Sequence, residues 1–404
     1  MKRTVCFVDF NSYFAAVEQH ANVLLRGKPV AVIATMTDAT CCIAASREAK
    51  RYGIKTGTPV RDARARCPEI TFVLSDAVKY MHYHRRLVAL IEEEIPVEKV
   101  CSIDELYGVF TGPYAEKEKV WKIALQLKRR LAQDFGDPLT CSIGLAPTVF
   151  LAKTASDMRK PDGLVWLDAQ QPGPEFFELE LRDLCGIGAK MHERLKTRGI
   201  RTVRQLWNAT PQQLRTVWGG IEGERFWQAL HGIEPIRPEI TPRQIGHSKI
   251  LHPDLRHEDG ARAMLERLVY KAALRLRREG WECGEMHITV KSSRDVMQPS
   301  WSVMARFPST QEVRTLLEVW RMMWRERARA LSHPFAVAVD LCRLLAHSDP
   351  RLPLFAPDPR EQALSRLLDQ VSKRHGAKAL WFGSAQAALS EDVPRIAFQS
   401  LPDV

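Results

Sequence analysis

The sequence has no long hydrophobic run and no closely spaced cysteine pair. No apolar stretch among its 404 residues approaches the roughly 18 residues that a membrane span needs. Asp9 and Asn11 interrupt the short apolar stretch that follows the basic N-terminus, so a signal peptide is not expected. The 9 cysteines form no CxxC pair, so the sequence suggests neither a zinc site nor a disulfide framework. These absences predict a cytoplasmic protein with reduced thiols and no membrane partner.

Internal repeats and low-complexity segments are also lacking, whereas positive charge is abundant. The formal net charge is +11 and the pI is about 9.3. Such a balance favours a polyanionic partner, usually nucleic acid, although a merely basic protein remains the alternative. More than half of the net charge falls within residues 237–346. This part of the chain is therefore the first candidate for contact with nucleic acid.

The order of predicted elements divides the chain into five parts, which is expected of a chain too long for one domain. Strands alternate with helices over residues 1–170, which predicts an α/β domain with one mainly antiparallel sheet. Short helices follow over 171–236, and a proline-containing linker over 237–246. Residues 247–345 read as strand, helix, strands, helix and strand. A proline-rich tail covers 346–404.

Three acidic residues stand out on the predicted strands of the first domain. Asp9 comes at the end of the first strand, and Asp104 and Glu105 lie side by side in "CSIDELYGVF", which reads as a strand. If the two strands are neighbours, three carboxylates converge, and their repulsion requires cations. Oxygen ligands suit Mg²⁺, and two such ions could activate an attacking hydroxyl and stabilise a leaving oxygen. The alternative is that these residues are ordinary acids at a solvated sheet edge.

Four motifs in order resemble those of one enzyme family. They are "FVDFNSYFAAVEQ", "CSIDELY", "CSIGLAPTVFLAKTASDMRKPDG" and "LCGIGAKMHERLKTRGI". Their order and spacing are similar to those of the Y-family, the translesion DNA polymerases of the bacterial polymerase IV and V group. The resemblance is close over residues 3–240 and looser through 345 and the tail. It implies a multidomain α/β (α+β) protein shaped as a right hand.

The resemblance implies a template-directed DNA polymerase that extends a primer 3′-end with deoxynucleotides. Asp9, Asp104 and Glu105 match the family's catalytic carboxylates, and the carbonyl of Phe10 matches a further metal ligand. Two Mg²⁺ ions are the implied cofactors, with Mn²⁺ as an alternative. The implied biology is low-fidelity synthesis past damaged bases, as part of DNA repair and the SOS response.

Two aromatic residues match the family's nucleotide-binding region. Phe14, five residues after Asp9, corresponds to the steric gate, a ring that fills the space which a ribose 2′-OH would need. Tyr13 precedes it and is expected to contact the nucleotide. The alternative is that Phe14 is a core aromatic on a helix.

The basic residues expected near the triphosphate include departures from the polymerase IV pattern. Lys160 in "MRKPDG" matches a lysine that contacts the incoming triphosphate. Lys50 stands where many relatives have a phosphate-binding arginine, and Arg47 where several have a tyrosine. Asn11 replaces a second aspartate, and the polymerase V branch shares both this Asn and the Lys. Lys50 and Arg47 could instead lie on a solvated basic helix face.

The remaining regions match the family's DNA-binding parts. Residues 1–170 correspond to palm and fingers, with the fingers at about 15–80, and 171–236 correspond to a helical thumb. The thumb's "LCGIGAK" resembles a helix–hairpin–helix, in which Gly186, Gly188 and Lys190 would hold a DNA phosphate. A plain tight turn is the alternative.

Residues 247–345 correspond to a βαββαβ-like little finger, in which "HITVKSSR" alternates apolar with polar or basic residues and leaves one strand face for phosphates. Beyond it, "RLPLF" resembles the motif that docks on the sliding clamp, with Leu352, Leu354 and Phe355 as apolar anchors. The family usually begins this motif with glutamine, whereas this chain has Arg351. The implied partners are primer–template DNA, deoxynucleoside triphosphates, the clamp and other damage-response proteins.

Two other classes of protein remain open. Some family relatives have lost their acids and act as non-catalytic adaptors for DNA, clamp and repair partners. A DNA-binding repair module of the helix–hairpin–helix kind is the third possibility, but it leaves residues 1–170 unexplained. The three acids present here favour the enzyme.

Overall fold

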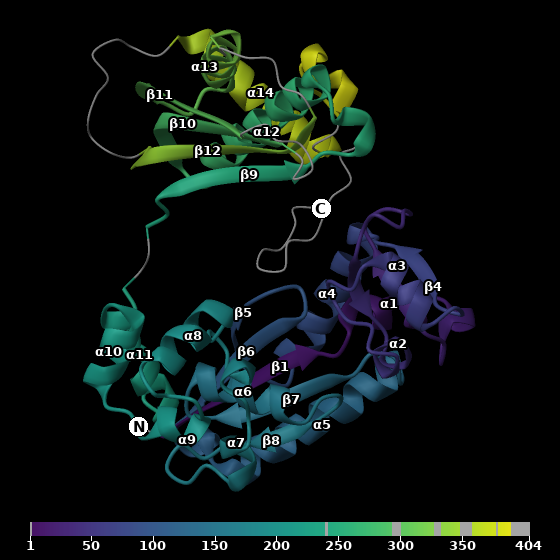
Figure 1. The fold of residues 1–404 in the computed structure, drawn as a ribbon, viewed down its shortest axis with the longest axis vertical. Helices are drawn as coiled ribbons and strands as arrows, with labels where there is room; N and C mark the ends of the chain where they lie inside the picture. The colour runs from purple at the N-terminus through teal and green to yellow at the C-terminus, as the bar shows by residue number, and fades with distance from the viewer. Residues whose placement is uncertain are drawn as a thin grey trace. The chain divides into compact units, whose positions relative to one another are not determined.

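The computed structural model describes residues 2–238, 241–292, 300–326, 333–347, 358–376 and 379–388. The described chain forms two compact units that divide after Arg237. Figure 1 shows both units. Among the helices of these residues, none has the length and apolar character needed to cross a membrane.

A five-stranded sheet forms the centre of the N-terminal unit. Its strand order is β5-β6-β1-β7-β8, and only β7 and β8 pair in parallel. The central strand β1 is rich in β-branched and aromatic residues and is buried from its second residue onward. The five strands are β1 (Arg3–Phe10), β5 (Val97–Val100), β6 (Glu105–Thr111), β7 (Cys141–Ala146) and β8 (Leu164–Trp166).

The two faces of this sheet pack against different helices. Because strand side chains alternate, Cys6 and Val8 join one core with α4 (Ala77–Glu92) and α5 (Lys117–Phe135). Val5 and Phe7 join another with α6 (Val149–Met158) and the short helices that follow. The sheet is therefore a buried central layer. The face to which a β1 side chain points decides which helices it contacts.

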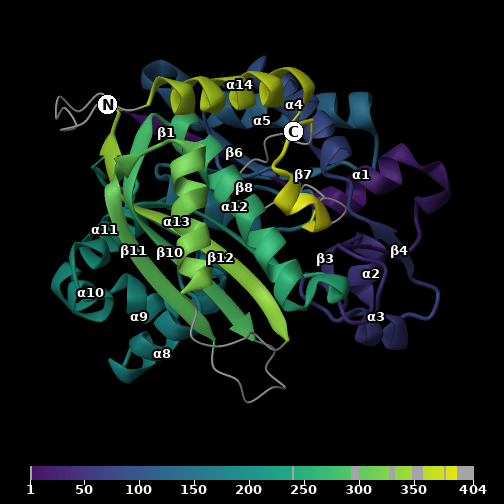
Figure 2. The same ribbon diagram turned by 90° about the horizontal axis from the view of Figure 1, so that it is seen from above.

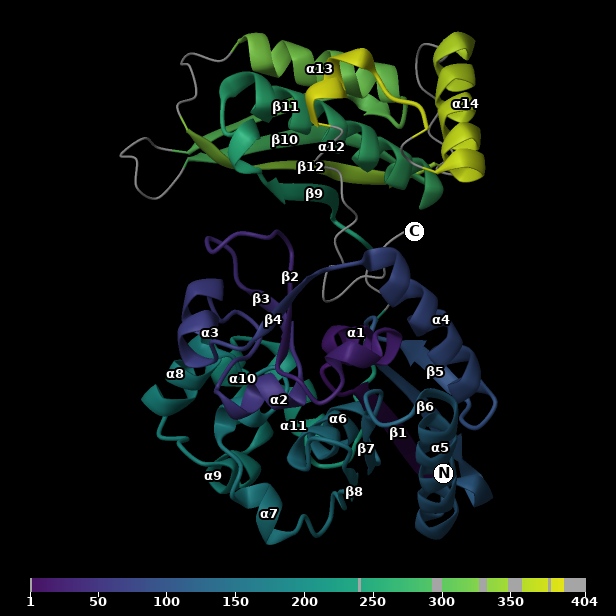
Figure 3. The same ribbon diagram turned by 90° about the vertical axis from the view of Figure 1, so that its right-hand side faces the viewer.

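A second, smaller sheet corrects the prediction of a single sheet over residues 1–170. Its strand order is β3-β2-β4, with β2 and β4 parallel. One face of it has a small core of its own, while Val32 and Ala44 on its strands join the main core. Figure 3 shows it beside α3 and away from α5. Its elements and the helix before them are α1 (Tyr13–Ala21), β2 (Val30–Ile33), β3 (Cys42–Ala45), α2 (Arg47–Arg51), α3 (Val60–Arg66) and β4 (Thr71–Leu74).

Short helices complete the N-terminal unit, as the sequence predicts. Thr202 and Thr210 cap two of them through their side-chain oxygens. Their apolar residues join the core beneath α6. These helices are α7 (Pro174–Phe177), α8 (Ala189–Thr197), α9 (Val203–Trp207), α10 (Pro211–Trp218) and α11 (Ile221–Leu230).

The C-terminal unit is an antiparallel four-stranded sheet with helices on one face. The strand order is β11-β10-β12-β9, and Figure 2 shows α12 and α13 lying across it. Apolar residues at helical spacing on α13, such as Leu316, Trp320 and Met323, are buried against the strands. The elements are β9 (Gln244–Ile250), α12 (Glu258–Arg278), β10 (Trp281–Ser292), β11 (Trp301–Thr310), α13 (Val313–Arg325) and β12 (Pro334–Ala346). β9 takes in the last three residues of the predicted linker, 244–246.

Part of the predicted tail packs on this unit. Helix α14 (Pro359–His375) is anchored by Asp369, whose two carboxylate oxygens accept from Arg277 at 2.6 and 2.8 Å. Tyr270 and Ser372 form a second contact at 3.2 Å between hydroxyl oxygens. The helix is therefore an added layer of the C-terminal unit and not a free extension.

Candidate active site

Asp9 and Glu105 lie directly opposite each other on β1 and β6. Side chains two residues apart on a strand share a face. Asp9 therefore shares a face with Phe7, and Glu105 with Tyr107, and both aromatic residues pack on the side of α6. The two acid-bearing strands are therefore neighbours, which was the condition for the acids to converge.

Asp104 lies in a turn and not on the strand. The amides of Cys101 and Ser102 both donate to the carbonyl of Glu105, at 2.9 and 3.1 Å, so the backbone folds back before β6 begins. The prediction of one continuous strand through "CSIDELYGVF" is therefore wrong. In a continuous strand, the side chains of Asp104 and Glu105 would point to opposite faces of the sheet. The turn breaks this alternation. Ser102 Oγ then donates to Asp104 Oδ1 at 2.6 Å, and the Phe10 amide donates to the Asp104 carbonyl at 2.9 Å.

Lys153 on α6 connects the acids, and the sequence analysis did not identify it. Its Nζ lies 2.5 Å from Asp9 Oδ2 and 2.7 Å from Glu105 Oε1. Burial lowers the pKa of Lys153, but the surrounding carboxylates outweigh burial and hold the pKa above its usual value. The side chain therefore stays a cation inside the acidic cluster.

A close approach of α6 to β7 places Lys153 there. A Cβ on Gly144 of β7 would lie 1.9 Å from the carbonyl oxygen of Ala152. No side chain fits between the helix and the strand at this point, so glycine is required. The residue after Ala152 is thereby brought over the sheet at the level of Asp9.

Lys160 adds a second cation from the loop that follows α6. Its Nζ lies 2.8 Å from Asp9 Oδ2 and 2.7 Å from Asp157 Oδ1. Asp157 also lies 3.4 Å from Lys153, one helical turn earlier. The structure thus brings the predicted Lys160 to the predicted Asp9.

The three carboxyl groups differ in how readily they ionise. Burial raises the pKa of Asp9, but Lys153 and Lys160 outweigh it, and the net pKa is lowered. For Asp104, burial dominates and the charge of Asp9 adds to it, so the pKa is raised. Burial also raises the pKa of Glu105 and outweighs the ammonium of Lys153, which lowers it. The cluster therefore combines one carboxyl group that ionises readily with two that resist ionisation.

Phe14 lies on α1, and the residue is 6% exposed. It stacks on Tyr80 of α4, with ring centroids 4.4 Å apart and an interplanar angle of 12°. The Tyr80 hydroxyl donates to Glu18 at 2.8 Å, and Lys79 pairs with the same carboxylate. Phe14 is thus supported from behind by a ring that is itself fixed by hydrogen bonds.

Tyr13 is also buried. Its hydroxyl donates to the backbone carbonyl of Tyr80 at 2.7 Å. Burial, together with the charge of Asp104, raises its pKa. This hydrogen bond holds α1 against α4. The hydroxyl is thus engaged within the protein, and the predicted contact with a nucleotide would have to use the backbone or the ring of Tyr13.

Arg47 and Lys50 lie on α2 near Lys160. Arg47 donates to the hydroxyl of Thr140 and to the carbonyl of Asp137, at 3.2 Å for the latter. Burial lowers the pKa of Lys50, and the charges of Lys160 and Arg47 lower it further. Lys160 thus contacts Asp9, Lys50 lies close enough for the charge of Asp9 to act on it, and Arg47 lies near Lys50.

Asn11 occupies a buried position between β1 and the loop of Lys160. Its Oδ1 accepts from the Asp162 amide at 2.8 Å, and its Nδ2 donates to Ser142 Oγ at 3.0 Å. Thr140 Oγ1 donates to the same Oδ1 at 3.1 Å. This departure from the polymerase IV pattern therefore has a structural role, the attachment of the loop to the sheet.

The predicted hairpin contains a single 3₁₀ turn, Leu181–Asp183, before α8. Gly186 has a φ of +86°, which side chains rarely adopt, whereas Gly188 is extended at the N-cap of α8. Lys190 is exposed in the first turn of this helix. The predicted clamp anchors Leu352, Leu354 and Phe355 lie outside the described residues.

The acidic cluster fits divalent cations. The Lys153 ammonium already occupies a shared position between Asp9 and Glu105, as a bound cation would. The donors are carboxylate oxygens, which suit Mg²⁺. Burial, with the charge of Asp9 added, raises the pKa values of Asp104 and Glu105, and a bound cation would offset both effects.

Comparison with known proteins identifies the family over most of the chain. Residues 8–157 match the impB/mucB/samB family, and residues 242–345 match the C-terminal domain of the same family. Residues 182–234 match the thumb domain of DNA polymerase iota.

Curated relatives match almost end to end. DNA polymerase IV of Moorella thermoacetica is 31% identical over 389 residues, which cover 93% of this chain and 94% of the relative. DNA polymerase IV 1 of Bacillus subtilis is 28% identical over 390 residues, covering 95% and 93%. A Y-family DNA polymerase chimera of known structure superposes with a TM-score of 0.68 at 20% identity, over 85% of this chain and 99% of the chimera. The last match supports the right-hand fold with a thumb and a C-terminal little finger. The chain belongs to the impB/mucB/samB family and is a Y-family, DNA-directed DNA polymerase.

Proposed function

We propose that Asp9, Asp104 and Glu105 hold two divalent cations, Mg²⁺ or Mn²⁺, at which nucleotidyl transfer takes place. The single observation that carries this proposal is the Lys153 ammonium lying between Asp9 and Glu105. The carbonyl of Phe10 would be a further ligand. When bound, the cations supply Lewis-acid stabilisation of the attacking and leaving oxygens. The role of the protein is to fix the carboxylates in advance, through the strand register and the turn before Glu105.

Lys160, Lys50 and Arg47 bind the triphosphate of the incoming nucleotide. Lys160 and Lys50 near Asp9, with Arg47 close to Lys50, form a positive region that suits a polyanion. Lys50 contributes a point charge without the fork of an arginine. Arg47 is attached to Thr140, so it can also fix α2 against the sheet domain.

Phe14 excludes ribonucleotides, and Tyr13 contributes to the same nucleotide site. A ring clashes with a 2′-OH only if it cannot move aside. The stacked Tyr80 supplies that resistance. Selection against ribose therefore depends on both rings, Phe14 for the clash and Tyr80 for its support.

DNA is bound by the thumb and by the little finger. The amides near Gly186 and Gly188, with Lys190, hold a backbone phosphate at the start of α8. The strand face of the C-terminal unit that carries no helices binds further phosphates. We assign residues 1–170 to palm and fingers, 171–236 to the thumb, 247–345 to the little finger, and Leu352, Leu354 and Phe355 to clamp docking.

Low fidelity and synthesis past lesions complete the proposal. The helices of the predicted fingers are short, with α2 at 5 residues and α3 at 7. Such helices can cover little of a nascent base pair, so a distorted pair meets few contacts. Extension across a template abasic site, compared with an undamaged template, tests this part directly.

Primer extension by Asp104→Asn tests the catalytic assignment. We expect a loss of about 100-fold or more with Mg²⁺, the scale for removal of one electrostatic group from an active site. Asp134→Asn, an exposed acid on α5, is the matched control. DNA binding, followed by fluorescence anisotropy, should be kept in both variants. Equal extension by Asp104→Asn and the unchanged protein would contradict the assignment, and DNA binding without extension by the unchanged protein would indicate an adaptor.

A further inference from the structure

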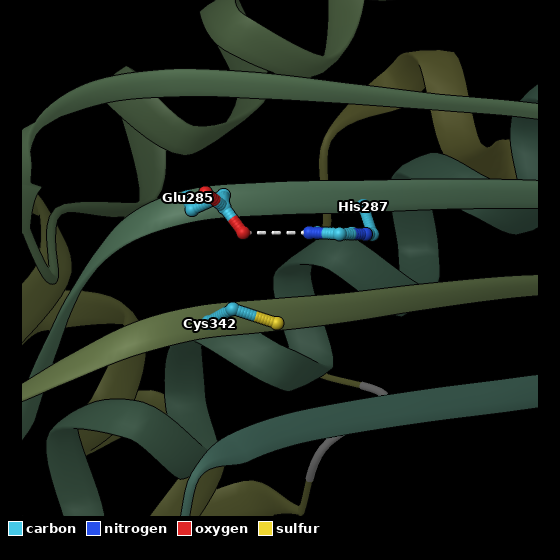
Figure 4. A group of neighbouring side chains, drawn as sticks. All are labelled: Glu285, His287 and Cys342. Carbon is cyan, nitrogen blue, oxygen red and sulfur yellow. Dashed lines mark hydrogen bonds and ion pairs between the residues drawn. The ribbon is translucent and has the colours of Figure 1, made fainter.

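A second group of potential metal ligands lies on the C-terminal unit, far along the chain from the acids. Figure 4 shows Glu285 and His287 on β10 and Cys342 on β12. Glu285 and Cys342 are direct partners in the strand register. His287 is two residues beyond Glu285 and therefore points to the same side of the sheet.

This side of the sheet is the one without helices. Neighbouring residues Met286, Ile288 and Leu341 point the other way, into the core against α12 and α13. A register shift between Cys283 and Glu285 reverses the parity of β10 at that point, so that Glu285 faces outward although Cys283 is buried. The three polar side chains thus share the helix-free face by virtue of the bulge.

The three donor atoms already converge. One ligand atom from each residue lies within 4.8 Å of the other two. Glu285 Oε1 and His287 Nε2 are 2.7 Å apart. Donor atoms around a tetrahedral zinc ion are about 3.5 Å apart, as bond lengths of 2.0–2.3 Å require. Small side-chain rotations would therefore bring the three atoms to that spacing.

The surroundings hold the carboxylate in place. Arg306 Nε donates to Glu285 Oε2 at 2.8 Å, which leaves Oε1 directed at His287. The side chain of Glu285 is only 12% exposed. Asp340 lies directly across from His287 on β12 and adds a negative charge on the same face. A divalent cation would compensate both this charge and a Cys342 thiolate.

We propose that Glu285, His287 and Cys342 bind one borderline divalent transition-metal ion of the Zn²⁺ class. Glu285 Oε1, His287 Nε2 and Cys342 Sγ are the ligands, and water completes a tetrahedral set. On binding, Cys342 releases its thiol proton to solvent, and no oxidant or reductant is involved. Imidazole and thiolate select such ions over Mg²⁺. The site therefore differs in kind from the all-oxygen cluster at Asp9.

A cobalt titration of the full chain tests the proposal. The protein is first stripped of metal with a chelator, and the chelator is then removed. Co²⁺ bound by a thiolate gives an intense near-ultraviolet charge-transfer band, which oxygen ligands at the catalytic acids do not give. We expect a band that saturates at one Co²⁺ per chain and is removed by Zn²⁺ but not by excess Mg²⁺. Absence of a saturating band would overturn the proposal.

Single substitutions identify the ligands. Cys342→Ser should abolish the band, and His287→Gln should weaken Co²⁺ binding by about 100-fold, the upper range for disturbed metal sites. Cys185→Ser, at an exposed thiol of the N-terminal unit, is the matched control and should leave the band unchanged. Cys342→Ser is nearly isosteric, and its circular dichroism spectrum should match that of the unchanged protein. A band lost in Cys185→Ser but kept in Cys342→Ser would refute the assignment.

Discussion

Phe14 and Tyr80 form a parallel stack, with ring centroids 4.4 Å apart, although they lie on different helices. The stack gives the proposed steric gate a rigid support. Tyr80 is in turn held by its hydrogen bond to Glu18, which is buried and paired with Lys79. Sugar selection should therefore respond to both rings, and in different ways.

Phe14→Ala should raise incorporation of ribonucleotides, because it opens the space that a 2′-OH needs. The measurement is primer extension with matched ribo- and deoxynucleotides, expressed as the ratio of kcat/KM values. Deoxynucleotide use should fall much less than ribonucleotide use rises. An unchanged ratio would reject Phe14 as the gate.

Tyr80→Leu should also raise ribonucleotide incorporation, since a flexible side chain no longer holds the Phe14 ring. Tyr80→Phe is the matched control, because it keeps the stack and loses only the hydrogen bond to Glu18. We expect the control to retain sugar selectivity. A similar loss of selectivity in both variants would assign the effect to Glu18 and not to the stacked ring.

Lys153→Met should destabilise the metal-free protein. Removal of one partner from a largely buried ion pair costs about 3 kcal/mol, because the remaining charges repel. Added Mg²⁺ should restore more stability to this variant than to the unchanged protein. Thermal unfolding in chelator and in Mg²⁺ measures both effects, with Lys122→Met, an exposed lysine on α5, as control. Equal stabilities in chelator would show that Lys153 does not neutralise the acids.

Asp104→Asn should stabilise the metal-free protein while removing its activity. The pKa of Asp104 is raised in the folded state, so folding disfavours its charged form. Its ionisation therefore lowers stability as pH rises through the ordinary carboxyl range, about 4, and beyond. At pH 7 we expect a gain of about 1 kcal/mol, typical for neutralising an active-site charge. The gain should vanish near pH 3, where Asp104 is protonated in both states, and a gain of equal size there would contradict the charge argument.

Asn11→Ala should destabilise the protein by about 2 kcal/mol, since the Asp162 amide and Ser142 lose buried partners. Asn11→Asp keeps an acceptor for the Asp162 amide and should cost less. Urea unfolding of the two variants gives the comparison. If Asn11→Asp were the more damaging, the amide donor to Ser142 would be the dominant contact.

The sequence could predict those parts of the molecule that depend on local patterns. Helical spacing predicts α4 and α13, and the motif order predicts Asp9, Asp104 and Glu105 as a group. The turn at 101–104 could not be predicted, because its apolar neighbours continue the strand pattern on both sides. It depends on two amides that meet the Glu105 carbonyl.

Lys153 and the cluster of Glu285, His287 and Cys342 could not be predicted from the sequence for a second reason. A lysine on an amphipathic helix usually faces solvent, and only the approach of α6 at Gly144 brings this one to Asp9. The cysteine at 342 has no CxxC partner, and its neighbours on the sheet come from a strand more than fifty residues earlier. In both cases tertiary packing, and not spacing in the sequence, creates the site.

Anomalous diffraction from crystals grown with Mn²⁺, primer–template DNA and a non-hydrolysable deoxynucleoside triphosphate is the most direct test of the catalytic site. We expect two manganese peaks bound by the carboxylates of Asp9, Asp104 and Glu105, with Lys153 moved out of the space between Asp9 and Glu105. Crystals with bound nucleotide in which Lys153 still bridges these two carboxylates, with no manganese beside them, would contradict the account.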